Sequence, residues 1–126
     1  MEILVSGETS KLRSVIIGIA DSLGNISSLK ELYDPKSIEN FKKGTYPLES
    51  DMVKELENFV ILLKKYNVKV YRPNLIKDYN QIFTRDIGFV IDNIFFKSNI
   101  LPKRAKEFQG LVSILSNFHN KIGNPV

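Results

Sequence analysis

The sequence predicts an α/β fold, because strand-like and helix-like segments follow one another twice in the same order. Each repeat opens with an apolar, β-branched segment and continues with a longer segment of helical periodicity. The length of 126 residues fits one compact domain with its own hydrophobic core. Alternation of this kind is typical of units in which a helix connects neighbouring strands.

The first repeat opens with residues 12–18, which are rich in Val and Ile and end in Gly. Residues 2–5 are a second candidate strand, and the turn-forming residues 6–10 between the two allow a hairpin. Residues 20–47 then form a long connection with one expected helical turn at residues 36–41. Connections of this length are uncommon in compact domains unless they serve a purpose such as covering a site.

Helical periodicity is clearest in residues 49–66, where apolar side chains recur on one face. Ser50 or Asp51 can cap the start of this helix, and Asn67 supports its end. Residues 68–71 then alternate as a short strand, which Arg72-Pro73 stops. The apolar face of the helix consists of Met52, Leu56, Phe59, Val60 and Leu63.

The second repeat begins with two strand-like runs, residues 87–91 and 94–97. Asp92-Asn93 joins them, and both residue types tolerate the positive φ of a tight hairpin turn. The sequence therefore predicts a β-hairpin. Its aromatic side chains, Phe89, Phe95 and Phe96, are expected in the core.

A helix is expected after Pro102, ending near residues 121–123. By analogy with the first repeat a strand should follow, yet the sequence stops at Val126. A helix that leads to no strand leaves a sheet edge unpaired. We therefore expect the chain to be a fragment of a longer domain.

The charge pattern argues against a polyanionic partner. Eighteen Lys and Arg residues against 14 Asp and Glu residues leave a net charge of +4, but the lysines are scattered among acidic neighbours. No basic stripe interleaved with aromatic residues is present, so we expect a solvated surface and no nucleic-acid partner. The apolar runs are far shorter than the ~20 residues of a membrane span. Glu2 stands in place of a basic region and no long apolar stretch follows it, so we do not expect these first residues to be a secretory signal. A soluble, cytoplasmic protein with no membrane partner is expected.

The composition also excludes several kinds of catalytic site within these residues. The chain has no Cys, so it holds no disulfide framework, thiolate metal site or cysteine nucleophile. It has no P-loop, no Rossmann glycine pattern and no cluster of metal ligands. We expect no cofactor and no metal.

Polar and charged residues lie directly before the first strand of the predicted hairpin, and Asp86 is the last acidic residue among them. A carboxylate at the mouth of a strand can face a pocket while the apolar residues after it anchor it in the core. A guanidinium is its natural ligand, because its paired N–H groups match the two carboxylate oxygens. The alternatives are an internal salt bridge with a nearby Arg, or a cap of a helix or turn.

Four segments, taken in order, resemble the guanidino-group-modifying enzymes, the superfamily of amidinotransferases, arginine deiminases and dimethylarginine dimethylaminohydrolases. Asn80 with Phe83-Thr84-Arg85-Asp86 matches the N-x-x-F-T-R-D motif, and Lys103-Arg104-Ala105-Lys106-Glu107 matches the R-x-x-E stretch that follows it. Residues 11–18 resemble the opening strand of the family, and residues 68–73 resemble its helix-to-strand segment. The resemblance covers essentially all of this chain but less than half of a typical member. It implies a partial α/β-propeller (pentein) fold built of ββαβ units, with about two of five units present.

The resemblance also implies roles for three residues. Asp86 would hold the substrate guanidinium, while Asn80 and Arg104 would help to bind the α-carboxylate end of an arginine-like substrate. Two alternatives stay open: Arg104 at a helix start is also typical of a solvated surface, and Asn80 is also suited to satisfying backbone groups in a turn. Arg85 is expected to be an ion-pair partner within the protein.

The chain departs from the family in its catalytic residues. Members use a Cys nucleophile, a His in an H-x-D motif and a Glu-Gly-Gly-Asp stretch, none of which this sequence contains. His119 lacks an Asp two residues later and is not expected to be catalytic. The sequence therefore predicts the N-terminal portion of a guanidine-modifying transferase or C–N hydrolase, inactive alone and with no catalytic residue of its own. The alternative is a short, non-catalytic module that binds a guanidino ligand or a completing chain, and a homo-oligomer is also possible.

Overall fold

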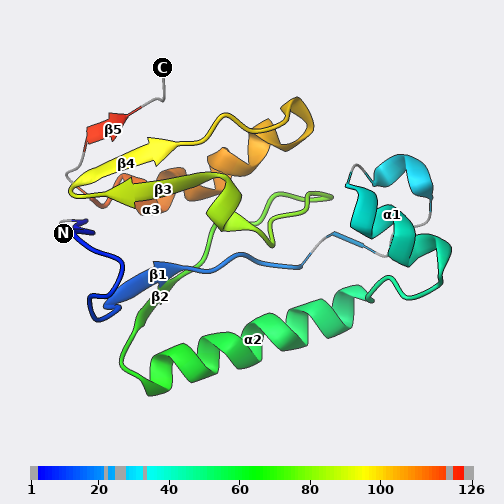
Figure 1. The fold of residues 1–126 in the computed structure, drawn as a ribbon, viewed down its shortest axis with the longest axis horizontal. Coiled ribbons are helices and arrows are strands. Elements are labelled where there is room, and N and C mark those ends of the chain that lie inside the picture. Colours follow the sequence, from blue (N-terminus) through cyan, green and yellow to red (C-terminus); the bar gives the residue numbers. More distant parts are fainter. Residues whose placement is uncertain (1–2, 22, 25–27, 33, 119–120, 124–126) are drawn as a thin grey trace.

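The computed structural model describes residues 3–21, 23–24, 28–32, 34–118 and 121–123, and it consists of two strand–helix–strand units (Figure 1). The first unit contains β1 (Ser14–Ile16), α2 (Glu49–Lys65) and β2 (Lys69–Tyr71). The strands β1 and β2 are parallel, with Val15 opposite Val70. Parallel neighbours need a crossover connection, which α2 supplies.

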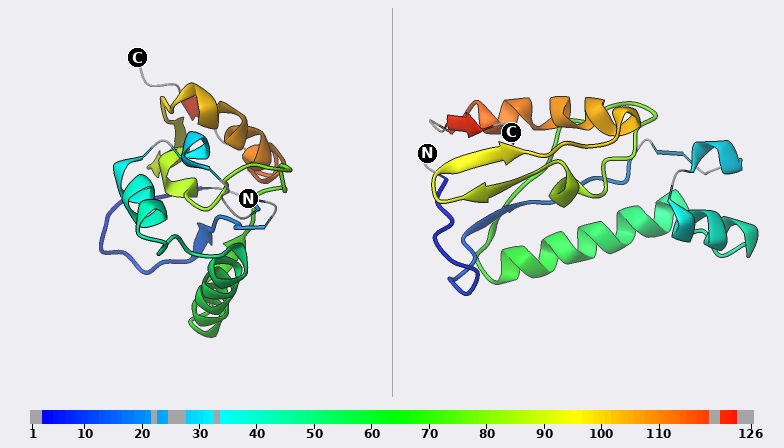
Figure 2. Two further views of the ribbon diagram at one scale, coloured as in Figure 1. Left: turned by 90° about the vertical axis from the view of Figure 1, so that its right-hand side faces the viewer. Right: turned by 45° about the horizontal axis from the view of Figure 1, so that its top comes forward.

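The second unit is a three-stranded sheet with a helical segment. The strands β3 (Gly88–Ile91) and β4 (Ile94–Lys97) form an antiparallel hairpin, and β5 (Lys121–Gly123) pairs with β4 in parallel. Between β4 and β5 the chain winds through the 3₁₀ helix η3 (Pro102–Leu111) and the short α3 (Val112–Leu115). The strands of the two units lie between α2 on one side and η3–α3 on the other (Figure 2).

Within the described residues, three shorter helices lie in the connections. The 3₁₀ helix η1 (Leu29–Glu31) and α1 (Pro35–Lys42) lie between β1 and α2, and the 3₁₀ turn η2 (Thr84–Asp86) leads directly into β3. Asp34 caps α1 by accepting a hydrogen bond from the backbone N–H of Ser37 at 2.8 Å.

The core joins the two units through the second sheet. It is formed by side chains of β4, η3 and α3 around the fully buried Ile87, with Ile16 and Tyr71 of the first unit packed against them. Tyr71 also meets Phe118 edge to face at a centroid distance of 5.5 Å. The buried members of the cluster are Ile87, Phe95, Leu111, Ile114 and Leu115.

Most of the predicted elements are confirmed, including the helical turn in the first connection, the long helix, the strand after it and the hairpin. Asn67 and Asp92 have φ values of 59° and 49°, so each adopts the left-handed conformation that ends α2 and turns the hairpin, respectively. The helix after Pro102 is present, but it begins as a 3₁₀ helix.

The predicted N-terminal hairpin is wrong for the described residues. Val5 pairs instead with Asp92 in the turn of the β3–β4 hairpin, with reciprocal N–H···O bonds of 2.8 Å. The strand β1 pairs with β2, because α2 brings β2 alongside it. The predicted caps Ser50 and Asp51 are also wrong, since α2 already begins at Glu49 and its N-cap, Leu48, makes no side-chain cap bond.

The end of the second unit also differs from the prediction. We expected the helix to run to residues 121–123 with no strand after it, but these residues are β5. Ser116 Oγ and Asn117 Nδ2 both donate to the carbonyl oxygen of Ser113, at 3.0 and 2.8 Å, and such local bonds compete with helix continuation. The helix therefore ends early enough for a strand to follow.

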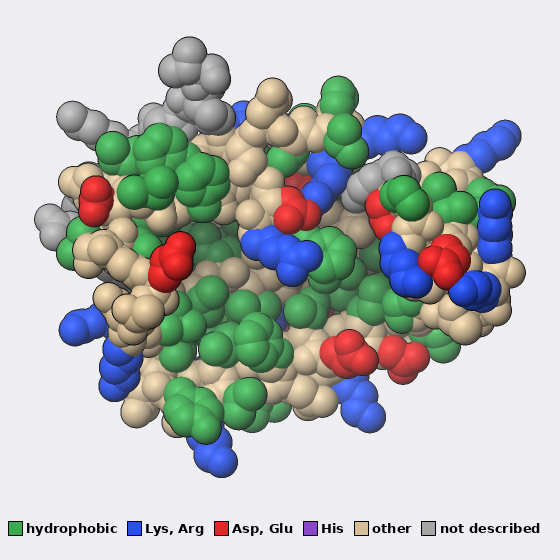
Figure 3. All heavy atoms as spheres, in the orientation of Figure 1, with side chains coloured by type: hydrophobic (Ala, Val, Ile, Leu, Met, Phe, Trp, Pro, Cys, Tyr) green, Lys and Arg blue, Asp and Glu red, His purple; other side chains and the backbone are tan. Residues whose placement is uncertain are grey.

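Phe89, a predicted core side chain, and Phe59, on the predicted apolar face of the long helix, are both exposed. Phe59 on α2 is 46% exposed and Phe89 on β3 is 48% exposed. Phe89 stacks on Phe96 of the neighbouring strand, on the face of the hairpin opposite the buried Phe95. Hydrophobic side chains accordingly gather over the β3–β4 hairpin and over α2 on the surface in Figure 3.

Candidate functional site

The candidate site lies where the loop after β2 meets η2 and η3. Gln81 holds this loop in place and is only 1% exposed. Its Nε2 donates to the carbonyl oxygen of Asn74 at 2.9 Å, and its Oε1 accepts from the N–H of Ile76 at 2.7 Å. The N–H of Ile19, just after β1, donates to the backbone carbonyl of Gln81 at 3.1 Å. The side-chain amide of Gln81 therefore holds two parts of the loop together, and the backbone carbonyl of Gln81 connects the loop to the first unit.

The 3₁₀ turn η2 presents Asp86 at the start of β3. Thr84 Oγ1 donates to the carbonyl oxygen of Ile16 at 3.2 Å, and Ile87 directly after the turn is fully buried. The side chain of Asp86 between these two anchors is 40% exposed. The apolar anchor directly after the carboxylate is the part of the arrangement that the sequence predicted.

Asp86 is engaged by a guanidinium from within the protein. Arg104 Nη1 donates to Asp86 Oδ2 at 2.8 Å, and Arg104 Nη2 donates to the carbonyl oxygen of Phe83 at 3.3 Å. The side chain of Arg104 is 12% exposed. The structure thus contains the internal salt bridge that the sequence analysis left open as an alternative, and it brings two of the three candidate residues into contact.

The other edge of the same guanidinium binds Glu107. Arg104 Nε and Nη2 lie 2.6 and 2.8 Å from Oε1 and Oε2 of Glu107, which is 1% exposed. In a 3₁₀ helix residues three apart lie in line, so Arg104, Glu107 and Gly110 form one row of η3. Gly110 in this row is also buried, and a Cβ there would lie 2.7 Å from Gln81 Nε2. The row faces the loop that Gln81 holds.

Asn80 and Arg85 lie in the same region, where Asn80 is partly buried and Arg85 is exposed. Asn80 Oδ1 accepts from the N–H of Ile82 at 3.1 Å, which is the local turn contact that the sequence also allowed. Arg85 Nε lies 3.5 Å from Asp86 Oδ1, and its guanidinium lies 5.0 Å from the ring centroid of Phe83. Arg85 is 79% exposed, so this ion pair is open to solvent.

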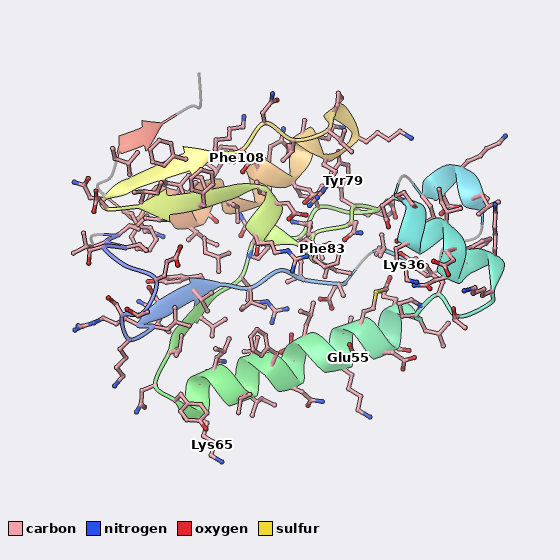
Figure 4. All side chains as sticks on the ribbon, viewed as in Figure 1. Lys36, Glu55, Lys65, Tyr79, Phe83 and Phe108 are labelled. Carbon is pink, nitrogen blue, oxygen red and sulfur yellow. The ribbon has the colours of Figure 1, made fainter. Side chains whose placement is uncertain are left out.

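Figure 4 labels Tyr79 and Phe83, which belong to the segment before η2, and Phe108 on η3. The hydroxyl of Tyr79 donates to the backbone carbonyl of Lys103. This bond ties the loop to the first turn of η3, directly before Arg104.

Gln81 and Glu107 are the functional candidates that sequence reasoning missed. Both lie within the segments that carry the family resemblance, but neither was given a role. The i,i+3 spacing of Arg104 and Glu107 was a usable signal, because oppositely charged residues at this spacing lie on one side of a helix. Nothing in the sequence marks Gln81 as buried.

The described residues contain no group of three or more His, Cys, Asp and Glu side chains that could hold a metal ion. No helix among them combines the length and apolar character needed to cross a bilayer. His119, which we did not expect to be catalytic, lies outside the described residues.

Comparison with known proteins identifies the fold. No protein-family profile matches the chain, and no curated protein sequence matches it significantly. Among solved structures, SxtG, an amidinotransferase from Microseira wollei in the saxitoxin biosynthetic pathway, is similar over 98% of this chain with a TM-score of 0.72 and 18% identity. Inosamine-phosphate amidinotransferase StrB1 from Streptomyces griseus is similar over 100% of the chain, with a TM-score of 0.68 and 16% identity.

The chain therefore has the mixed helix and strand fold of the amidinotransferases, and the resemblance to this superfamily inferred from its motifs is confirmed at the level of the fold. It spans 42% of the length of SxtG and 44% of the length of StrB1.

Proposed function

We propose that the chain is the N-terminal portion of an amidinotransferase-like enzyme that acts on the guanidino group of arginine or a related compound. Its two strand–helix–strand units would be about two of the five ββαβ units of an α/β propeller. The observation that carries this proposal is the carboxylate of Asp86, which is anchored by η2, accessible from solvent and already paired with a guanidinium.

In this proposal Asp86 binds the guanidinium of the substrate. A carboxylate binds this planar cation through charge-assisted hydrogen bonds, which are stronger than neutral ones. Asn80 and Arg104 bind the α-carboxylate of the substrate, although Arg104 contacts Asp86 and Glu107 in the present structure. The exposed Arg85 has to give way at Asp86 Oδ1 as the ligand enters.

The nucleophile has to come from sequence other than these residues. The resemblance implies attack on the guanidinium carbon by a Cys, with a His handling protons, and the 126 residues contain no Cys. We therefore expect no amidino transfer and no release of ammonia or urea from arginine by this chain alone. Turnover by the purified 126-residue chain that survives a thiol-alkylating reagent would contradict this expectation.

The second candidate is a non-catalytic module that binds a guanidino ligand or a chain that completes the propeller. The accessible carboxylate of Asp86 serves this candidate as well, and binding alone requires no nucleophile. Reading the gene beyond the codon for Val126, together with the intact mass of the native protein, separates the two candidates. A downstream Cys and H-x-D motif supports the enzyme, and a stop codon supports the module. The cytoplasmic location, the absence of nucleic-acid, membrane, cofactor and metal partners, and a possible homo-oligomer stay predictions.

The ligand itself is tested by titrating the 126-residue chain with arginine and following backbone amide resonances. We expect shifts around η2 in the wild type and at least about tenfold weaker binding in Asp86→Asn, since a charge-assisted hydrogen bond is lost. Asp92→Asn is the matched control, because Asn also tolerates the positive φ at this turn. Equal affinity in the wild type and in Asp86→Asn would reject the proposed role of Asp86.

A further inference from the structure

Glu107 is a buried carboxylate without a role in the proposed function. It is 1% exposed, and both of its oxygens accept hydrogen bonds from one edge of the Arg104 guanidinium. A buried carboxylate is tolerated when a cation and good hydrogen-bond geometry compensate for lost hydration. The 3₁₀ winding of η3 aligns the two residues, so the backbone itself sets this two-point contact.

The contact with Glu107 determines which N–H groups of Arg104 can donate to Asp86. With Nε and Nη2 directed at Glu107, Arg104 reaches Asp86 through Nη1, and it does so at Oδ2. The other oxygen, Asp86 Oδ1, is approached by Arg85, whose side chain is 79% exposed. Asp86 and Glu107 are two carboxylates against the one guanidinium of Arg104, so the group can accept one further cation, which the exposed Arg85 supplies in the present structure.

We propose that Glu107 is a positioning residue for Asp86. By binding Arg104 along one edge, Glu107 limits Arg104 to a single contact with Asp86 and leaves Asp86 Oδ1 for a guanidino ligand. Without the charge of Glu107, Asp86 becomes the better partner for a two-point contact with Arg104. Both oxygens of Asp86 are then occupied. This inference rests on the proposed function, since it assumes that Asp86 binds a guanidino ligand.

The first test replaces Glu107 by Gln, which keeps the shape and removes the charge. The probe is agmatine, an arginine analogue without the α-carboxylate, so that a direct contact between Arg104 and a carboxylate cannot contribute. We expect agmatine to bind Glu107→Gln at least about tenfold more weakly than the wild type, with the amide spectrum showing an intact fold. Glu57→Gln is the matched control, because Glu57 also accepts from an arginine, Arg72, but is 52% exposed. Unchanged agmatine affinity in Glu107→Gln would overturn the inference.

Two further variants separate positioning from a merely structural role. Glu107→Asp keeps the charge and is expected to retain most of the agmatine affinity. The double variant Arg104→Gln with Glu107→Gln removes the competing guanidinium as well, so its agmatine affinity should return toward that of the wild type. A double variant that binds as weakly as Glu107→Gln, in an intact fold, would contradict competition by Arg104.

A crystal structure of the Glu107→Gln chain distinguishes failure of the inference from failure of the proposed function. We expect Arg104 to move onto both oxygens of Asp86, whether or not a ligand binds. An Arg104 that keeps its single contact with Asp86 would refute the positioning role. A wild type that binds neither arginine nor agmatine would refute the proposed function and leave the crystal structure to decide the role of Glu107.

Discussion

Arg104 and Glu107 place two opposite charges in a part of the molecule with little access to solvent. Because Glu107 is 1% exposed, Arg104→Ala would leave a buried carboxylate without its guanidinium. We expect this variant to lose about 3–5 kcal/mol of unfolding free energy, the typical cost of breaking a buried pair. Denaturant unfolding of the purified chain measures this loss.

The exposed pair of Lys36 and Glu39 provides the control for that measurement. Its side chains are 72% and 43% exposed, so Lys36→Ala should change the unfolding free energy by no more than about 1 kcal/mol. Equal losses of unfolding free energy in Lys36→Ala and Arg104→Ala would show that the burial of Glu107 does not add to the strength of its ion pair.

Asp34 at the start of α1 couples stability to pH. Hydrogen bonds from the side chain and the backbone N–H of Ser37 hold the pKa of Asp34 below its usual value of 3.8. The ionised carboxylate therefore stabilises the folded state above pH 3.8, and this contribution is lost as the pH falls through the lowered pKa. Asp34→Ala should cost about 0.5–2 kcal/mol at neutral pH and progressively less in acid.

Asp34→Asn separates the cap from the charge. Asn is an equally good N-cap, so this variant should match the wild type at neutral pH but lack the acid-dependent loss. Urea unfolding at pH 7 and at several values near pH 3 gives both quantities. A pH profile for Asp34→Asn identical to that of the wild type would contradict the assignment of this titration to Asp34.

At the candidate site, the sequence predicts only those features that residues adjacent in the chain determine. Asp86 could be placed at a strand mouth because the apolar residues directly after it predict its anchor. Its contact with Arg104 joins residues 18 positions apart, and it depends on how η3 packs against η2. The sequence around Asp86 is equally compatible with an internal salt bridge and with a ligand contact, and only the packing of the chain shows that Arg104 lies beside it.

At the scale of the elements, the junction between the two units depends on a close approach at Gly18. A Cβ at this position would overlap the backbone carbonyl oxygens of Ile82 and Gln81, which cannot move without displacing the loop before η2. We expect Gly18→Ala to lose at least about 1–3 kcal/mol, as overpacking typically does. Thermal unfolding detects this loss as a lower Tm.

Gly7 offers the matched control for Gly18. A Cβ at Gly7 meets only Ser10 Oγ, at 3.6 Å, which is an ordinary contact. Gly7→Ala should therefore leave the Tm near that of the wild type. If Gly18→Ala also leaves the Tm unchanged, the junction does not depend on the close contact between the segment after β1 and the loop before η2.

The elements that the sequence predicts well are those whose signals are local. The helix α2 has 17 residues of clear periodicity, and the β3–β4 hairpin has a turn residue that adopts positive φ. The errors concern pairing over long distances: Val5 pairs with Asp92, and β5 pairs with β4 after a helix of irregular winding. No local pattern in a three-residue strand specifies its partner, so these pairings follow from the packing of whole units.

At the scale of the whole molecule, the β3–β4 hairpin is apolar on both faces. One face carries Val90 and Phe95, which η3 and α3 cover. The opposite face carries Phe89 and Ile91, which are 48% and 53% exposed, beside their cross-strand partners Phe96 and Ile94. Sheets that are apolar on both faces normally have both faces covered, so this open face has the composition of an interface.

We expect the 126-residue chain to self-associate through this open face at high concentration, because burying it removes apolar surface from water. The double variant Phe89→Ser with Ile91→Thr should lower the weight-average mass measured by sedimentation over a concentration series. Ile61→Thr is the matched control, since Ile61 on α2 is 65% exposed and lies on another element. Self-association that persists in the double variant would contradict a role of the open hairpin face. Self-association that disappears equally in Ile61→Thr would contradict it as well. In a chain as long as SxtG or StrB1 the same residues would instead be free to pack against further units, so the longer chain should show no such dependence on concentration.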